Sequence, residues 1–116
     1  MVTQVISNTQ NQLTTPLYTG TGVTCSVTFA NPVVNTPIVN WPAVDPTTVL
    51  FTYQTNGSTT VWQYEVDEQV TRISTGVYQV ELDTTALPGQ WQVKWQGTGT
   101  CAAVWASSFF VSPSPI

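Results

Sequence analysis

Two β-rich stretches of the chain flank the dipeptide Asn56-Gly57, and this feature constrains the fold most. Asn-Gly is the preferred pair for a two-residue type I′ turn, so residues 48–66 are expected to form a β-hairpin. The turn fixes the register of the hairpin and places Phe51 opposite Trp62, on a face that is mostly apolar. A sheet with one apolar face must bury that face against a second layer. We therefore expect Phe51 and Trp62 to be buried neighbours.

The same alternation of apolar and polar residues recurs along the chain. Residues 23–29, 78–83 and 91–95 alternate with a period of two, as half-buried strands do. A short strand is expected at 70–73 and a last strand at 101–111, with turn signals roughly every 8–12 residues. The sequence therefore predicts an all-β fold, an immunoglobulin-like antiparallel β-sandwich of about seven strands. Its inward positions predict one core cluster of Phe29, Phe51, Tyr78, Val80, Trp91 and Val93.

The 116 residues are enough for one domain, which we divide into three parts. Residues 1–22 are rich in Thr, Asn, Gln and Gly and are expected to be an extended N-terminal arm that is ordered only where it docks. Residues 23–112 are expected to be the sandwich, and residues 113–116 a short C-terminal tail.

The surface of this chain is expected to form hydrogen bonds and to carry little charge. Charged residues make up 7% of the chain, against roughly 25% in average domains. Such surfaces suit extracellular adhesion domains and virion proteins. Arg72 and Lys94 are the two basic residues and the net charge is −4, so the basic footprint that nucleic acid or an anionic membrane surface requires is missing. No apolar run approaches the roughly 18 residues of a membrane span.

The residues offer little for catalysis, and we expect no enzyme and no cofactor. The chain contains no His, the usual general base and the commonest metal ligand. Glu65, Asp67 and Glu68 could form a Ca²⁺ site, but they lack the spacing of a calcium loop and are interpreted as a solvated turn, with no metal. Glu81 and Asp83 are conceivable as a glycosidase pair, although nothing else in the sequence builds a sugar cleft.

Two cysteines, Cys25 and Cys101, leave two alternatives open. They could form a disulfide, if their geometry permits one. In a reducing bacterial cytosol, two buried thiols are favoured instead.

Several aromatic residues fall where a core does not explain them. Trp41 lies in a Pro-rich loop, and Trp105 in a last strand that is apolar on both faces. Phe109 and Phe110 are adjacent, so one of them must leave the core, and we expect another chain to cover it. The N-terminal arm adds two apolar residues near its start. The candidate interface residues are therefore Trp41, Trp105, Phe109, Phe110, Val5 and Ile6.

A run of residues in the second half of the chain follows a recognisable order. It reads Thr-Gly-Val-Tyr-Gln-Val-Glu-Leu-Asp at 75–83, then Pro-Gly at 88–89, then Gln-Trp-Gln-Val-Lys-Trp-Gln-Gly at 90–97. Asp-Pro-Thr-Thr-Val stands upstream at 45–49. This order resembles a set of small immunoglobulin-like proteins encoded among the structural genes of tailed bacteriophages. The resemblance covers roughly residues 44–112.

The resemblance implies a virion protein and carries no catalytic residues. We expect a capsid decoration or cement protein that binds the outside of a phage head and stabilises the shell. Its partners would be the major capsid protein and copies of itself, with no nucleic acid and no membrane. It would be located in the virion, which is assembled in the cytoplasm of the bacterial host. The alternative is an immunoglobulin-like adhesion module of a phage tail, baseplate or cell surface that binds a host glycan or protein.

Overall fold

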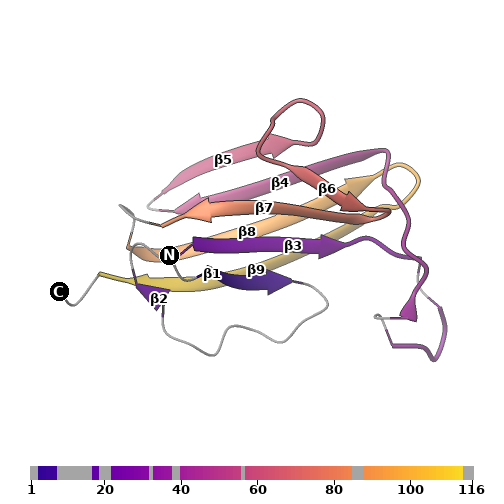
Figure 1. Ribbon diagram of the computed structural model, residues 1–116, viewed down its shortest axis with the longest axis horizontal. Coiled ribbons are helices and arrows are strands. Elements are labelled where there is room, and N and C mark those ends of the chain that lie inside the picture. Colours follow the sequence, from indigo (N-terminus) through magenta and orange to yellow (C-terminus); the bar gives the residue numbers. More distant parts are fainter. Residues whose placement is uncertain are drawn as a thin grey trace.

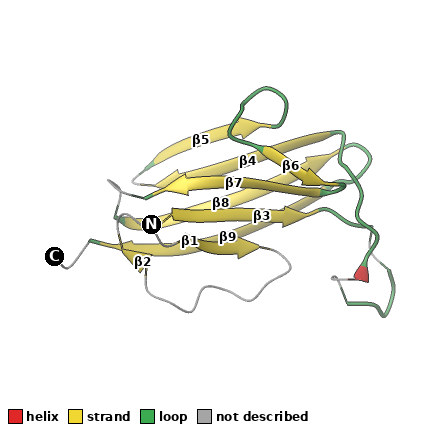
Figure 2. Cartoon of the chain, in the orientation of Figure 1, coloured by secondary structure: helices red, strands yellow, loops and turns green. Residues whose placement is uncertain are grey.

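The computed structural model is a two-layer β-sandwich (Figure 1). It describes residues 3–7, 17–18, 22–31, 33–37, 40–55, 57–84 and 88–113. One sheet has four strands in the order β1 (Thr3–Ser7), β3 (Gly22–Thr28), β7 (Val77–Asp83) and β6 (Thr71–Ser74). The other has five strands in the order β2 (Leu17–Tyr18), β9 (Ala103–Ser112), β8 (Gly89–Thr98), β4 (Thr48–Thr55) and β5 (Ser58–Gln63). Strands dominate the described chain (Figure 2).

The prediction of an all-β sandwich is confirmed. Strands β3–β9 are the expected seven, and they pair with one another antiparallel. Two further strands come from the residues expected to be an arm, because β1 pairs parallel with β3 and β2 pairs parallel with β9. The first strands of the chain therefore add one strand to each sheet.

The register predicted for the hairpin is confirmed. Phe51 lies opposite Trp62 and Tyr53 opposite Thr60. Gly57 has a φ of 81°, as a type I′ turn requires, and Asn56 lies outside the described residues. The prediction that both rings are buried is wrong for Trp62. Phe51 is fully buried, whereas Trp62 is half-buried, because β5 lies at the edge of its sheet and pairs with β4 alone among the described strands.

The predicted core is confirmed as one cluster between the two sheets. It holds Phe29, Phe51, Tyr78, Val80, Trp91 and Val93, together with Trp95, Phe109 and other buried residues. The aromatic rings lie in close contact, with ring centroids 4.8 Å apart for Phe51 and Trp95 and 5.8 Å apart for Trp91 and Phe109. Such pairs add specific geometry to the burial of apolar area. Both pairs join neighbouring strands of the five-stranded sheet, so they help to hold β4, β8 and β9 in register on the core side.

Both cysteines are buried in this core as free thiols. Burial raises the pKa of the Cys25 thiol to about 12, because the charged thiolate is disfavoured away from water. Of the two alternatives that the sequence leaves open, the structure has the reduced pair.

Candidate protein-binding surface

The five-stranded sheet turns every second side chain away from the core and so builds a flat surface, which we call the outer face. The alternation follows from the strand geometry: in β8, Trp91, Val93 and Trp95 are buried, and the residues between them point outward. The members of the outer face are Leu50, Thr52 and Gln54 of β4, Thr59, Val61 and Gln63 of β5, Gln90, Gln92, Lys94 and Gln96 of β8, and Val104, Ala106, Ser108 and Phe110 of β9.

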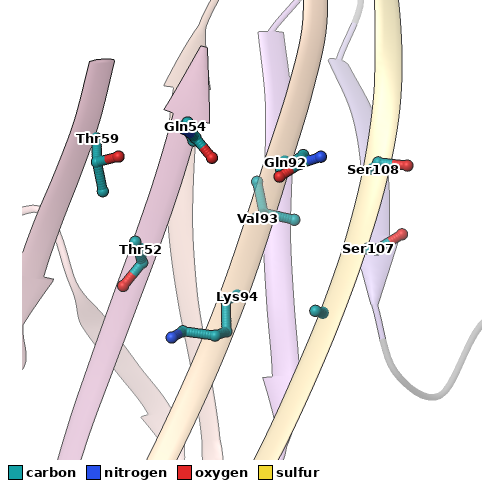
Figure 3. A pocket seen from close by; sticks show the side chains of 9 residues that line it. Thr52, Gln54, Thr59, Gln92, Val93, Lys94, Ser107 and Ser108 are labelled. Carbon is teal, nitrogen blue, oxygen red and sulfur yellow. The ribbon is translucent and has the colours of Figure 1, made fainter. Parts of the chain in front are cut away.

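The strand register aligns these side chains in rows across the sheet. Gln54 pairs with both Thr59 and Gln92, and Gln92 pairs with Ser108. In the next row Thr52 pairs with Lys94, whose side chain extends toward β4 in Figure 3. Between the rows lies an open hollow of about 660 Å³. Its lining residues are Thr52, Gln54, Thr59, Gln92, Val93, Lys94, Ala106, Ser107 and Ser108.

The hollow offers amides, hydroxyls and one ammonium group. The Gln amides and the Ser and Thr hydroxyls can each donate and accept hydrogen bonds, and Lys94 can donate. None of the nine lining residues carries a carboxylate, an imidazole or a thiol. This set suits the binding of a polar, hydrogen-bonding surface.

Three large apolar side chains on the outer face are exposed to solvent. Val61 on β5 is 53% exposed, and on β9 Val104 is 63% and Phe110 is 58% exposed. Val104 and Phe110 lie toward opposite ends of β9, and Val61 lies on the other side of the sheet. These three side chains lie apart from one another, so the outer face is mainly a polar surface with separate apolar contact points rather than one apolar patch.

The adjacent pair in β9 divides as its position in a strand requires. Phe109 is buried in the core, so it is not available as an interface residue, and Phe110 is the phenylalanine that points outward. The expectation that one of the two leaves the core is confirmed.

The two candidate tryptophans lie together, but not on the outer face. Trp41 and Trp105 are half-buried and line the same small cavity of about 190 Å³, together with Phe29. Trp105 lies opposite Trp95 and packs against the core, and the Trp41 Nε1–H donates a hydrogen bond to the carbonyl oxygen of Thr36 at 2.9 Å. Both rings are thus partly accounted for by contacts within the chain.

The two arm residues belong to the other sheet. Val5 pairs with Thr24 and Ile6 with Cys25 through the backbone of β1 and β3, whereas Phe110 is on β9. The structure therefore does not bring the six candidate residues onto one surface.

Sequence reasoning missed the polar members of the outer face as a site. The signal was present, because the outward positions of residues 48–66 and 90–96 are mostly uncharged and polar. What the sequence lacks is the order of the strands, which places β4 between β5 and β8.

A second polar cluster, centred on Asp45, holds a loop to the four-stranded sheet. The Asp45 Oδ1 accepts hydrogen bonds from the backbone N–H of Gly76 at 2.7 Å and from the hydroxyl of Tyr78 at 3.0 Å. Arg72 donates to both carboxylate oxygens, at 3.2 and 2.9 Å. The expected hydrogen bond of the buried Tyr78 hydroxyl is confirmed. The cluster ties the segment before β4 to the β6–β7 hairpin, which is a structural role.

The cluster shifts the pKa values of its members, and the hydrogen bond to Asp45 raises the pKa of Arg72. The hydrogen bonds from Arg72 and Gly76 lower the pKa of Asp45 to about 2, because they stabilise its ionised form. Burial, and then the hydrogen bond to Asp45, raise the pKa of Tyr78 to about 12.

The shift at Asp45 predicts how an Asp45→Asn variant depends on pH. The pKa is depressed in the folded state, so the stability that the charge contributes is present above the ordinary value of 3.8 and is lost as the pH falls toward 2. The wild type should therefore melt at a higher temperature than Asp45→Asn at neutral pH, and this gap should narrow between pH 3.8 and 2. Thermal melts followed by circular dichroism measure it.

Glu81→Gln is the matched control, because Glu81 is an exposed carboxylate on neighbouring β7. The melting temperature of Glu81→Gln should stay close to that of the wild type over the pH range in which Asp45→Asn is compared. A gap for Asp45→Asn that stays constant from neutral pH down to pH 2 would contradict the assignment.

The acidic residues after β5 make a turn. The Asp67 Oδ2 accepts a hydrogen bond from the backbone N–H of Gln63 at 2.9 Å, and Glu65 has a φ of 71°. Among the residues that the structure describes, no group of His, Cys, Asp and Glu side chains is arranged to hold a metal ion.

Comparison with known proteins adds no relative. No known protein family matches the chain, and no curated protein sequence matches it. Within the described ranges, no helix has both the length and the apolar character needed to cross a membrane.

Proposed function

We propose that this chain is a non-enzymatic structural protein of a tailed-phage virion, a decoration or cement protein that binds the outside of the head and stabilises the shell. The observation that carries the proposal is the outer face. It is a broad hydrogen-bonding surface with one charged side chain, Lys94, and three exposed apolar side chains. The resemblance of residues 44–112 to small phage structural proteins supplies the virion context.

The strand order supports the immunoglobulin-like part of the proposal. In one sheet β1, β3, β7 and β6 adjoin in that order, and in the other β4, β8 and β9 adjoin. This is the order of the A, B, E and D strands and of the C, F and G strands in immunoglobulin sandwiches. The parallel pairing of β1 with β3 departs from a purely antiparallel sheet.

The mechanism would be the burial of the outer face against the major capsid protein. Apolar area removed from water stabilises a contact by roughly 25 cal/mol per Å². The amides and hydroxyls can exchange water for hydrogen bonds to the shell, and because the face carries one charge, few ions lose hydration. Many weak contacts of this kind over a shell would oppose its expansion. The free thiols of Cys25 and Cys101 fit assembly in a reducing host cytoplasm.

Substituting Phe110 tests this proposal. Phe110→Ser removes the largest exposed apolar group of the outer face, so binding to particles that lack the protein should weaken by roughly threefold to tenfold, as for a large apolar contact away from the centre of an interface. The occupancy of purified particles is measured by quantitative gel densitometry, and the melting temperature of the isolated variant by circular dichroism. The melting temperature should stay near that of the wild type.

Ile73→Ser is the matched control. Ile73 is 53% exposed, close to the 58% of Phe110, but it lies on β6 in the other sheet. Ile73→Ser should occupy particles like the wild type. An unchanged occupancy of Phe110→Ser would place the binding surface elsewhere.

The hollow favours one second candidate, an adhesion module of a tail, baseplate or cell surface. Its volume of about 660 Å³ and its lining of amides and hydroxyls suit the hydroxyl groups of a glycan. Densitometry separates the two functions, because a cement protein is present in far more copies per particle than a tail module. Loss of glycan binding in Gln92→Ala would favour the adhesion module.

A further inference from the structure

The free edge of the five-stranded sheet at β5 differs from an ordinary protected edge. Among the described strands, β5 pairs with β4 alone. After a two-residue turn, every second residue of β5 exchanges hydrogen bonds with β4, beginning with Ser58. The N–H of Tyr64 follows this pattern, because it donates to the carbonyl oxygen of Val49 at 3.0 Å. The backbone groups of Thr59 and Val61 therefore point out from the sheet edge.

The strand β6, one of the two edge strands of the other sheet, has the features of a protected edge. The strand β6 has four residues and an irregular register between Arg72 and Ser74, and Arg72 is ion-paired with Asp45. Short length, irregularity and charge are the usual devices that prevent edge-to-edge pairing. The strand β5 has six residues, regular pairing, no charge and no proline.

We propose that the β5 edge binds the β5 edge of a second copy of this chain, antiparallel across a two-fold axis, so that two five-stranded sheets continue into one. The pairing is isologous, because the same backbone groups of Thr59 and Val61 serve both copies. It also places the exposed side chain of Val61 beside the neighbouring strand.

The distribution of charge favours a second copy as the occupant. The chain has a net charge of −4, yet no residue from Thr48 to Tyr64 is charged. Two copies that meet along β5 therefore bring no like charges together in the paired strands. Because the β5 edge carries no charge, no electrostatic repulsion opposes its pairing with the same edge of a second copy.

The turn that follows β5 limits the overlap of the two strands. The carbonyl oxygen of Gln63 accepts hydrogen bonds from the backbone N–H groups of Val66 and Asp67, at 3.1 and 2.8 Å, and its own N–H donates to Asp67. The open part of the edge thus ends before Gln63. The two-fold axis is expected at Thr59 or Thr60.

This inference rests on the proposed function, because the sequence analysis expects a cement protein of this kind to contact copies of itself. The contact is small, so the dimer is expected to be weak in solution and to be favoured where many copies crowd on a shell. Dimer formation is tested with the isolated chain, whereas capsid binding is tested with Phe110→Ser on particles. A failure of the dimer can therefore be distinguished from a failure of the proposed function.

Cysteine substitution along the edge tests the contact. At a two-fold axis, residues of antiparallel strands have Cα atoms about 4.5–5.5 Å apart, within reach of a disulfide. Thr59→Cys or Thr60→Cys should form a covalent dimer under mild oxidation at high protein concentration. Thr71→Cys on β6 is the matched control and should stay monomeric. The wild type shows how much cross-linking arises from the two native thiols, which are buried and should give none. Equal cross-linking of the β5 and β6 variants would overturn the proposal.

A proline at the edge provides a second, independent test. Val61→Pro removes an N–H that points away from β4, which an edge strand tolerates, whereas Val61→Ala keeps it. Sedimentation velocity should show a dimer fraction that rises with concentration for the wild type and for Val61→Ala. Loss of one hydrogen bond per copy should weaken the dimer of Val61→Pro by about tenfold. A Val61→Pro variant that dimerises like the wild type would overturn the proposal, and the cysteine result decides if Val61→Pro does not fold.

Discussion

Trp95→Ala should lower the free energy of unfolding by about 3–5 kcal/mol, as large truncations in a core do. Trp95 is fully buried on β8, the strand that lies between β4 and β9, and its ring is centred 4.8 Å from that of Phe51. Removing the ring leaves a cavity where the sheet has neighbours on both sides and cannot collapse easily. Urea unfolding followed by circular dichroism gives the change.

Trp62→Ala is the natural comparison, because it removes the same side chain from the edge strand. Trp62 is half-buried and stacks on Phe51 at 6.2 Å, so its loss should cost clearly less. Equal losses in the free energy of unfolding for Trp95→Ala and Trp62→Ala would contradict the assignment of Trp95 to the core and of Trp62 to the half-buried sheet edge.

Trp95→Phe separates packing from hydrogen bonding. The Nε1 atom of Trp95 is buried and has no hydrogen-bond partner among the residues that the structure describes, which is an unfavourable state for a polar group. Phenylalanine removes this donor and retains part of the ring, so Trp95→Phe should cost much less than Trp95→Ala.

Gly76→Ala should lower the free energy of unfolding by about 3 kcal/mol or more, from combined backbone strain and overlap. Gly76 has a φ of 73°, which a residue with a Cβ rarely adopts. An added Cβ would lie 2.5 Å from the carbonyl oxygen of Phe29 and 2.9 Å from the backbone nitrogen of Val44. Both neighbours are backbone atoms, so neither can rotate away. The urea midpoint should fall accordingly.

Gly57→Ala controls for the backbone conformation. Gly57 has a similar φ of 81°, but nothing lies within 4 Å of the position of an added Cβ. Its substitution should cost about 1 kcal/mol, the strain of a left-handed residue alone. Comparable losses at the two glycines would show that crowding at Gly76 is unimportant.

The features that the sequence predicts well are those that short stretches of chain decide. The Asn-Gly turn and the alternation around it agree, so the pairing of Phe51 with Trp62 follows from residues 48–66 alone. The adjacency of Phe109 and Phe110 likewise requires that they point to opposite faces. The core cluster follows from the inward positions once the strands are assigned.

The features that the sequence predicts poorly depend on which segments, far apart in the chain, come into contact in the folded structure. Asp45 is isolated in the sequence, and its partners Arg72, Gly76 and Tyr78 lie about thirty residues further on, so the cluster exists only after the sheets have assembled. The partial exposure of Trp62 depends on β5 being an edge strand, and alternation along a strand carries no information on its neighbours. The hollow on the outer face also depends on the strand order, because its lining residues come from β4, β5, β8 and β9.

The parallel pairing of β2 with β9 also determines how the domain responds to tension. Leu17 lies beside Val111 and Tyr18 beside Ser112, and the two strands run in the same direction. Pulling the chain before β2 and the chain after β9 in opposite directions slides these strands along each other, which strains all the bonds between them at once. A hairpin such as β4–β5, pulled at its two open ends, instead separates one bond at a time. The pairing of β2 with β9 thus meets a stretching force in shear.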